Sequence, residues 1–143
     1  MPTRLASEME RALRALARGV AARDRTTAAD AAIDVAQSSL DFQLRYREPT
    51  EIDIARFGLW ARQAVVDSAA GDVGGVRGDV TTMEWIRDRF ADAIDPAERT
   101  AIDAHLAVLR DAVANEEEDL EAATAEAKQL EQPLELEPVP LSD

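Results

Sequence analysis

A chain of 143 residues is long enough for one domain with a substantial core, and its 46% hydrophobic but only 4% aromatic composition favours close-packed, alanine-rich helices. The formal net charge of −13 argues against nucleic-acid binding, because so acidic a chain repels phosphates. The absence of cysteine excludes disulfides, thiolate zinc sites and cysteine nucleophiles.

Charge is distributed unevenly along the chain. Residues 1–25 carry six arginines, whereas residues 115–143 carry ten acidic residues and a single lysine. These segments are either solvated surfaces or a basic head and an acidic tail that pair, within one chain or between copies. No apolar run is long enough to span a bilayer, and the N-terminal residues lack the apolar segment of a signal peptide. We therefore predict a cytoplasmic protein without a membrane span, although an exported chain with its leader removed would look the same.

Two helices are predicted in the first third of the chain. Apolar residues at spacings of three and four predict a helix over residues 4–22. Thr26 or Thr27 is the predicted N-cap of a second helix, which runs to about residue 46. Residues 40–47 also alternate as a short strand would, but no second strand exists for them to pair with.

Four more helices and a tail are predicted in the rest of the chain. Thr50, with Asp53 three residues later, resembles a capping box and starts the third helix. Asp95 and Pro96 mark the start of the fifth helix, because a capping Asp precedes a Pro in the first helical position. The predicted ranges are 50–70, 73–93, 96–114 and 116–132, followed by an extended or disordered acidic tail at 133–143.

These elements predict an all-α protein, an antiparallel bundle of five or six helices arranged as three helical hairpins. We expect residues 1–132 to form a single helical domain and residues 133–143 to form the acidic tail. The three hairpins share a pattern of helix, polar turn and alanine-rich helix, in which Asp24 aligns with Asp72. Descent from an internal repeat and coincidence both explain this pattern.

Chemical motifs are scarce in this chain. His105 is the only histidine, and Ile102 stands where a di-iron helix would carry glutamate, so His105 is interpreted as a surface residue. The glycine-rich residues 71–79 follow a helix and lack the GK[ST] ending of a phosphate loop. We therefore predict no catalytic residue, no metal site and no cofactor, and an enzyme is disfavoured.

Both tryptophans lie away from the main apolar faces of their predicted helices. At about 100° per residue, Trp60 falls among polar residues, whereas Arg62 falls on the opposite, apolar face. Trp85 likewise faces away from the apolar stripe of the next helix. Either flanking hairpins cover the tryptophans, or they anchor a partner, because Trp and Arg are enriched among residues that dominate binding energy. Arg62 then requires a carboxylate from the protein or a bound anion. The stripe consists of Val76, Val80, Met83, Ile86, Phe90 and Ile94.

The tail offers a second candidate binding site. Its apolar residues lie among prolines and acids and resemble a short peptide that docks in a groove, with a solvated tail as the alternative. These residues are Leu134, Leu136, Val139 and Leu141.

The leading hypothesis is a non-catalytic interaction or assembly module. It binds a protein partner, or another copy of itself, through the central hairpin at residues 49–94. The alternative is a ligand-binding helical bundle, cytoplasmic or extracytoplasmic, that holds a small anion through Arg62 or a metal cation through acidic side chains.

Overall fold

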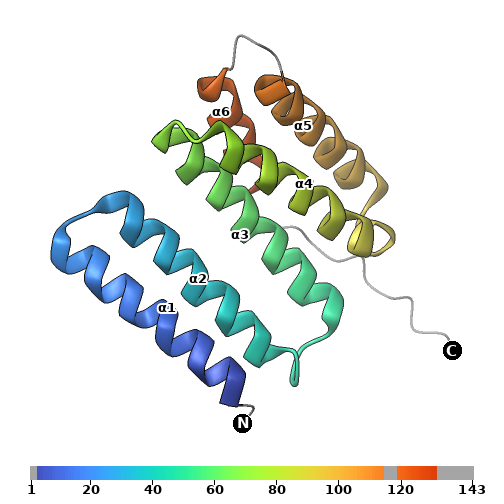
Figure 1. Cartoon of the computed structure of the whole chain (residues 1–143). Helices are drawn as coiled ribbons and strands as arrows, with labels where there is room; N and C mark the ends of the chain where they lie inside the picture. The colour runs from blue at the N-terminus through green and yellow to red at the C-terminus, as the bar shows by residue number, and fades with distance from the viewer. Residues whose placement is uncertain (1–2, 115–118, 132–143) are drawn as a thin grey trace, which may run out of the picture.

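The computed structural model describes residues 3–114 and 119–131, and these residues form six packed α-helices with no strand among them (Figure 1). The all-α prediction is therefore confirmed. None of the helices in these ranges is both long and apolar enough to cross a membrane. The tail residues predicted to dock lie outside the described residues.

The helices are α1 (Thr3–Ala22), α2 (Arg25–Gln43), α3 (Pro49–Ala70), α4 (Val73–Phe90), α5 (Pro96–Ala114) and α6 (Leu120–Leu130), with a 3₁₀ turn η1 (Ala91–Ala93) after α4.

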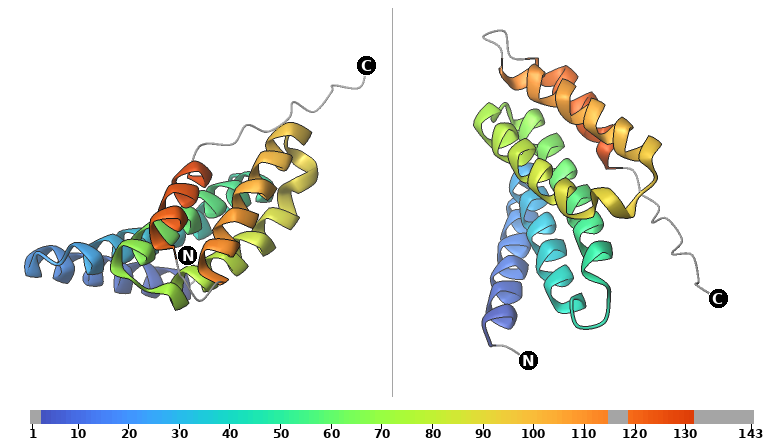
Figure 2. Two further views of the ribbon diagram at one scale, coloured as in Figure 1. Left: turned by 90° about the horizontal axis from the view of Figure 1, so that it is seen from above. Right: turned by 90° about the vertical axis from the view of Figure 1, so that its right-hand side faces the viewer.

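The helices pack as three antiparallel hairpins, α1–α2, α3–α4 and α5–α6 (Figure 1). Helix α3 lies at the centre, because it contacts α4, α6 and α2, while α1 packs mainly on α2. The α1–α2 hairpin therefore extends to one side of the bundle formed by α3, α4, α5 and α6 (Figure 2). This arrangement leaves the junction of α2, α3 and α4 at the surface, where the candidate site lies.

Each hairpin caps its second helix with an aspartate. In every case the carboxylate accepts a hydrogen bond from the backbone N–H three residues later, which satisfies one of the unpaired donors of the first turn. The shared cap gives a physical reason for the aligned aspartates of the sequence pattern. Asp24, Asp72 and Asp119 accept from Thr27, Gly75 and Ala122 at 3.0, 2.8 and 2.9 Å.

Two predicted helix starts are wrong, and both errors concern capping. The cap of α2 is Asp24, not a threonine, because its carboxylate reaches both the N–H and the hydroxyl of Thr27. Helix α3 begins at Pro49 without a side-chain cap, since proline has no N–H to satisfy and its φ suits the first helical position. At α5 the predicted cap is confirmed, with Asp95 accepting from the N–H of Ala97 at 2.7 Å.

The main core lies between α3, α4, α5 and α6. The predicted stripe from Val76 to Ile94 is buried at every one of its six positions, five of which lie on α4 while Ile94 follows η1. At the centre, the rings of Phe57 and Phe90 meet edge to face, with centroids 5.4 Å apart and an interplanar angle of 83°. Burial of these apolar side chains holds the α3–α4 hairpin against α5 and α6.

Gly19 allows close approach of α1 to α2. A Cβ atom at this position would lie 2.9 Å from the backbone nitrogen of Ala28 and 3.0 Å from its Cα. Backbone atoms cannot rotate away as a side chain can, so Gly19→Ala is expected to lower the free energy of unfolding by about 1–3 kcal/mol.

The matched control for this prediction is Gly78→Ala. Apart from the adjacent residues and the backbone of its own helix, no atom lies within 4 Å of a Cβ at Gly78, so this substitution is expected to raise the free energy of unfolding by about 0.5–1 kcal/mol through helix propensity. Urea unfolding followed by circular dichroism measures both variants. The same sign of effect at the two glycines would contradict the close-approach argument.

Candidate functional site

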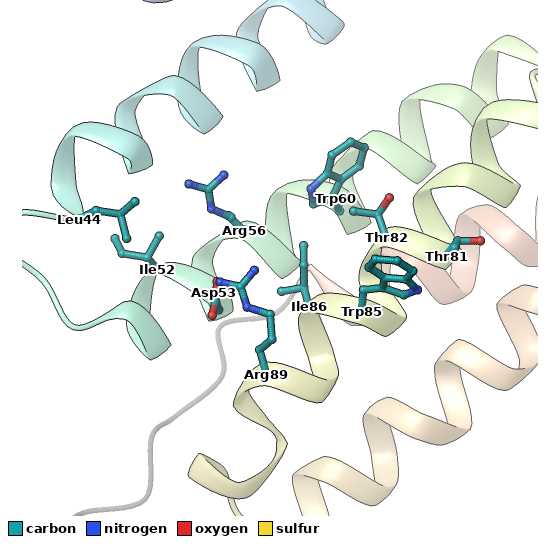
Figure 3. Close-up of a pocket in the computed structure, with 10 residues that line it drawn as sticks. All are labelled: Leu44, Ile52, Asp53, Arg56, Trp60, Thr81, Thr82, Trp85, Ile86 and Arg89. Atoms are coloured by element: carbon teal, nitrogen blue, oxygen red, sulfur yellow. The ribbon is translucent and has the colours of Figure 1, made fainter. Parts of the chain in front are cut away.

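The two tryptophans line one groove at the surface, formed by the end of α2 and by α3 and α4 (Figure 3). We call it the tryptophan groove, and its volume is about 630 Å³. Thr81 and Thr82 of α4 also line it, although the sequence analysis did not identify them. The groove residues are Leu44, Ile52, Asp53, Arg56, Trp60, Thr81, Thr82, Trp85, Ile86 and Arg89.

Trp60 and Trp85 occupy different environments in this groove. Trp60 is partly buried and packs against the edge of the main core. Trp85 is 75% exposed, although it lies on the same helix as the buried Ile86. The two predicted alternatives therefore apply to different residues. Neighbouring helices partly cover Trp60, whereas Trp85 remains exposed to solvent. The exposed indole of Trp85 offers a large apolar surface that a binding partner can bury.

The charged residues of the groove are paired within the chain. Arg56 forms an ion pair with Asp41 of α2, and Arg89 pairs with Asp53 at 3.0 Å. Asp53 is only 5% exposed, and its partner removes much of the cost of burying a carboxylate. These pairs leave the groove with no unmatched charge to attract a small ion.

The threonines of the groove are also satisfied internally. The hydroxyl of Thr81 donates to the carbonyl of Arg77 at 3.0 Å, and that of Thr82 donates to the carbonyl of Gly78 at 2.9 Å. Among the described residues, the buried polar atoms without a partner all belong to side chains outside the groove. The groove therefore presents mainly apolar surface, with hydroxyl oxygens that can still accept.

A polar cluster lies toward the other end of α3. The Gln63 side chain donates to Asp30 at 2.9 Å and to Asp67 at 2.8 Å, and Asp67 shares a hydrogen bond with Asp79 of α4. Burial, the largest cause, raises the pKa of Asp79 together with the charge and hydrogen bond of Asp67 and the charge of Asp72, and the resulting pKa is about 8. Asp79 therefore keeps its proton at neutral pH and donates it to Asp67.

Sequence reasoning missed Asp79, although a signal was present. The residue is three after Val76 and four before Met83, so it lies within the apolar stripe of α4 and is 4% exposed. An ionisable side chain in such a stripe must be paired or neutral. Within the described ranges no group of three or more histidine, aspartate or glutamate side chains is arranged to hold a metal ion.

Arg62 lies apart from the tryptophans. Its side chain is 60% exposed, and its guanidinium is 3.9 Å from the carboxylate of Glu131 at the end of α6. It lines a separate small pocket of about 170 Å³ between α2 and α3, together with Leu59 and Val66. The predicted carboxylate partner thus comes from the protein itself, and the structure does not bring Arg62 into the tryptophan groove.

His105 joins α5 to α6 by a contact between its Nδ1 and Glu126 Oε2 at 2.6 Å. Both side chains are partly exposed, and the pair lies outside the tryptophan groove. The geometry is that of a contact between two helices, in keeping with the interpretation of His105 as a surface residue.

Comparison of the chain with protein-family models, with curated proteins and with solved structures finds no match. Function is therefore inferred from the chemistry of the site.

Proposed function

We propose that the protein is a non-catalytic interaction module whose tryptophan groove binds apolar side chains of a protein partner. The observation that carries this proposal is Trp85, 75% exposed beside a groove that Trp60 also lines. Covering an indole of this exposure removes on the order of 100 Å² of apolar surface from water, which is worth about 3 kcal/mol before the costs of binding.

A protein partner suits the groove better than a small ion. Arg56 and Arg89 already have carboxylate partners, so an anion would have to displace Asp41 or Asp53. An apolar side chain needs no such exchange, because it brings no charge that must be matched. Anion binding at Arg62, the alternative hypothesis, has less support because Glu131 lies beside that guanidinium.

Photo-crosslinking tests the proposal directly. A benzoylphenylalanine residue replaces Thr81, which lines the groove and is exposed, in the protein produced by its own cells. We expect a covalent product of one defined mass, and we expect Trp85→Ala in the same chain to abolish it, because the indole supplies the contact energy.

The matched control places the same cross-linker at Val108 of α5, which is 48% exposed and lies away from the groove. This position is expected to give no defined product. Failure of the Thr81 position to cross-link any protein, or identical products from the two positions, would overturn the proposed function.

A further inference from the structure

We propose that residues 134–136, which follow α6, dock in the small pocket between α2 and α3. In this arrangement Leu134 and Leu136 contact the apolar walls of the pocket, and Glu135 pairs with Arg62. We call this pocket the α2–α3 slot. It is separate from the tryptophan groove, so this proposal and the proposed function can fail independently.

The α2–α3 slot has the size and the surface of a site for an apolar side chain. Its volume is about 170 Å³, and a cavity of about 150 Å³ in a protein core is large enough to hold benzene. Among the described residues that line it, all except Arg62 are apolar, and the small side chains of α2 leave the space open. These apolar residues are Ala29, Ala32, Ile33 and Ala36 of α2 and Leu59 and Val66 of α3.

The C-terminal end of α6 lies close to this slot. A Cβ atom at Gly58 of α3 would lie 4.0 Å from the carbonyl oxygen of Glu131, so the backbone at the end of α6 packs directly on α3. The next residue of α3, Leu59, lines the slot. Leu134 and Leu136 follow Glu131 by three and five residues, and extended chains of these lengths span about 10 and 17 Å. The slot is therefore within reach of both leucines without any rearrangement of the helices.

Arg62 gives the rim of the slot a charge that suits this segment. Its guanidinium lies 3.9 Å from the carboxylate of Glu131, which is too long for a hydrogen bond. The side chain is also 60% exposed, so its N–H groups can donate to a second carboxylate. In an extended backbone Glu135 points away from the two leucines that flank it. The long side chain of Arg62 can reach this outward-facing carboxylate from the rim.

Attachment to α6 favours this segment over an occupant from another molecule. A segment tethered a few residues from its site has an effective concentration in the mM range, far above that of a free partner at micromolar concentration. Docking also connects α6 to α2 across α3. Because α2 holds the α1–α2 hairpin to the bundle mainly through its contacts with α3, the docked segment acts as a strap on that hairpin.

The reactivity of a single introduced cysteine tests the proposal, because the chain contains no other cysteine. Ala32→Cys places a thiol at an exposed position that lines the slot. We expect iodoacetamide to modify this thiol at least about fivefold more slowly than in the same full-length chain with Leu134→Ala and Leu136→Ala, as for a slot covered about four-fifths of the time. Circular dichroism checks that both chains fold.

Two matched controls accompany this comparison. The first combines Val139→Ala with Leu141→Ala, the same kind of change farther along the segment, and is expected to leave the reactivity at position 32 unchanged. The second is Val108→Cys, at a position of α5 that is 48% exposed. Its thiol is expected to react at one rate whether or not Leu134 and Leu136 are replaced by alanine.

The same thiol at position 32 tests the ion pair. Arg62→Gln and Glu135→Gln are each expected to speed its modification about twofold or more. The double variant is expected to react no faster than either single variant, because loss of one partner already breaks the pair.

Any of four results would overturn the proposal. The first is equal reactivity at position 32 with and without Leu134 and Leu136. The second is an equal loss of protection in the Val139→Ala and Leu141→Ala control, which would mean that a different segment covers the slot. The third is protection that rises with protein concentration, because the occupant then comes from another copy. The fourth is an additive effect of the two ion-pair substitutions.

Discussion

Replacing Phe57 or Phe90 by alanine is expected to lower the free energy of unfolding by about 3–5 kcal/mol. Both side chains are 1% exposed, and they meet edge to face at the centre of the core that joins α3 and α4 to the last two helices. Each substitution removes a buried aromatic ring and the apolar contacts it makes. It also leaves a cavity that the surrounding helices cannot fill. The site depends on this contact, because α3 and α4 carry both tryptophans.

Urea unfolding of the two single variants and the double variant measures this effect. We expect a coupling energy of about 0.5–1.5 kcal/mol, because either substitution alone already removes the contact between the rings. Phe42→Ala is the matched control, since Phe42 lies on α2, is only partly buried and is outside the main core cluster. A cost for Phe42→Ala equal to the others, or strictly additive effects, would contradict the central role of the pair.

Substitution of Asp79 by asparagine is expected to stabilise the protein by on the order of 4 kcal/mol more at pH 9 than at pH 5. The pKa of Asp79 is about 8 in the folded protein, above the ordinary value of 3.8. The folded state therefore holds a proton that the unfolded state releases between these values. The free energy of unfolding consequently falls as the pH rises from about 4 to about 8 and levels off above that.

Asparagine imitates the protonated carboxyl at every pH. Its amide N–H can donate to Asp67 as the Asp79 proton does, and it carries no charge that burial would penalise. Denaturant unfolding at pH 5, 7 and 9 measures the difference. Asp92→Asn is the control, because Asp92 is fully exposed and its substitution affects only a surface ion pair with Arg99, at 3.3 Å, and the general repulsion of an acidic chain. Equal effects of Asp79→Asn at pH 5 and pH 9 would show that Asp79 is ionised at neutral pH.

The helices themselves were predictable because their signals are local. Apolar spacing and the Asp95-Pro96 start depend on neighbours within one or two turns, and the helix at Pro96–Ala114 begins where these residues indicate. The capping errors are also local: Asp24 and Thr27 both have oxygens suited to a cap, and the backbone geometry of the turn selected Asp24. The burial of Asp79 could have been predicted in the same way, because it is an acidic residue within an apolar stripe.

The candidate site was predictable only in part. The helical wheel correctly separates Trp85 from the buried stripe of α4, because the direction of a side chain follows from its position on the helix. It could not show that Trp60 is partly buried while Trp85 is 75% exposed, since that depends on how the neighbouring helices pack. Nor could it pair Arg62 with Glu131, which is distant in the chain and meets it only when α6 packs on α3.

The sequence by itself therefore determined the all-α class, the helical hairpins and the buried face of α4, since these depend on hydrogen bonds and apolar spacing within a few residues. The predicted face of α3 is wrong, because Arg62, expected on its apolar face, is 60% exposed, whereas Asp53 of the opposite face is buried. The tertiary structure alone decided that Trp60 and Trp85 share one groove, that its arginines are matched by Asp41 and Asp53, and that Asp79 is protonated against Asp67. These features depend on contacts between separate helices, whose relative placement is determined by packing of the whole core.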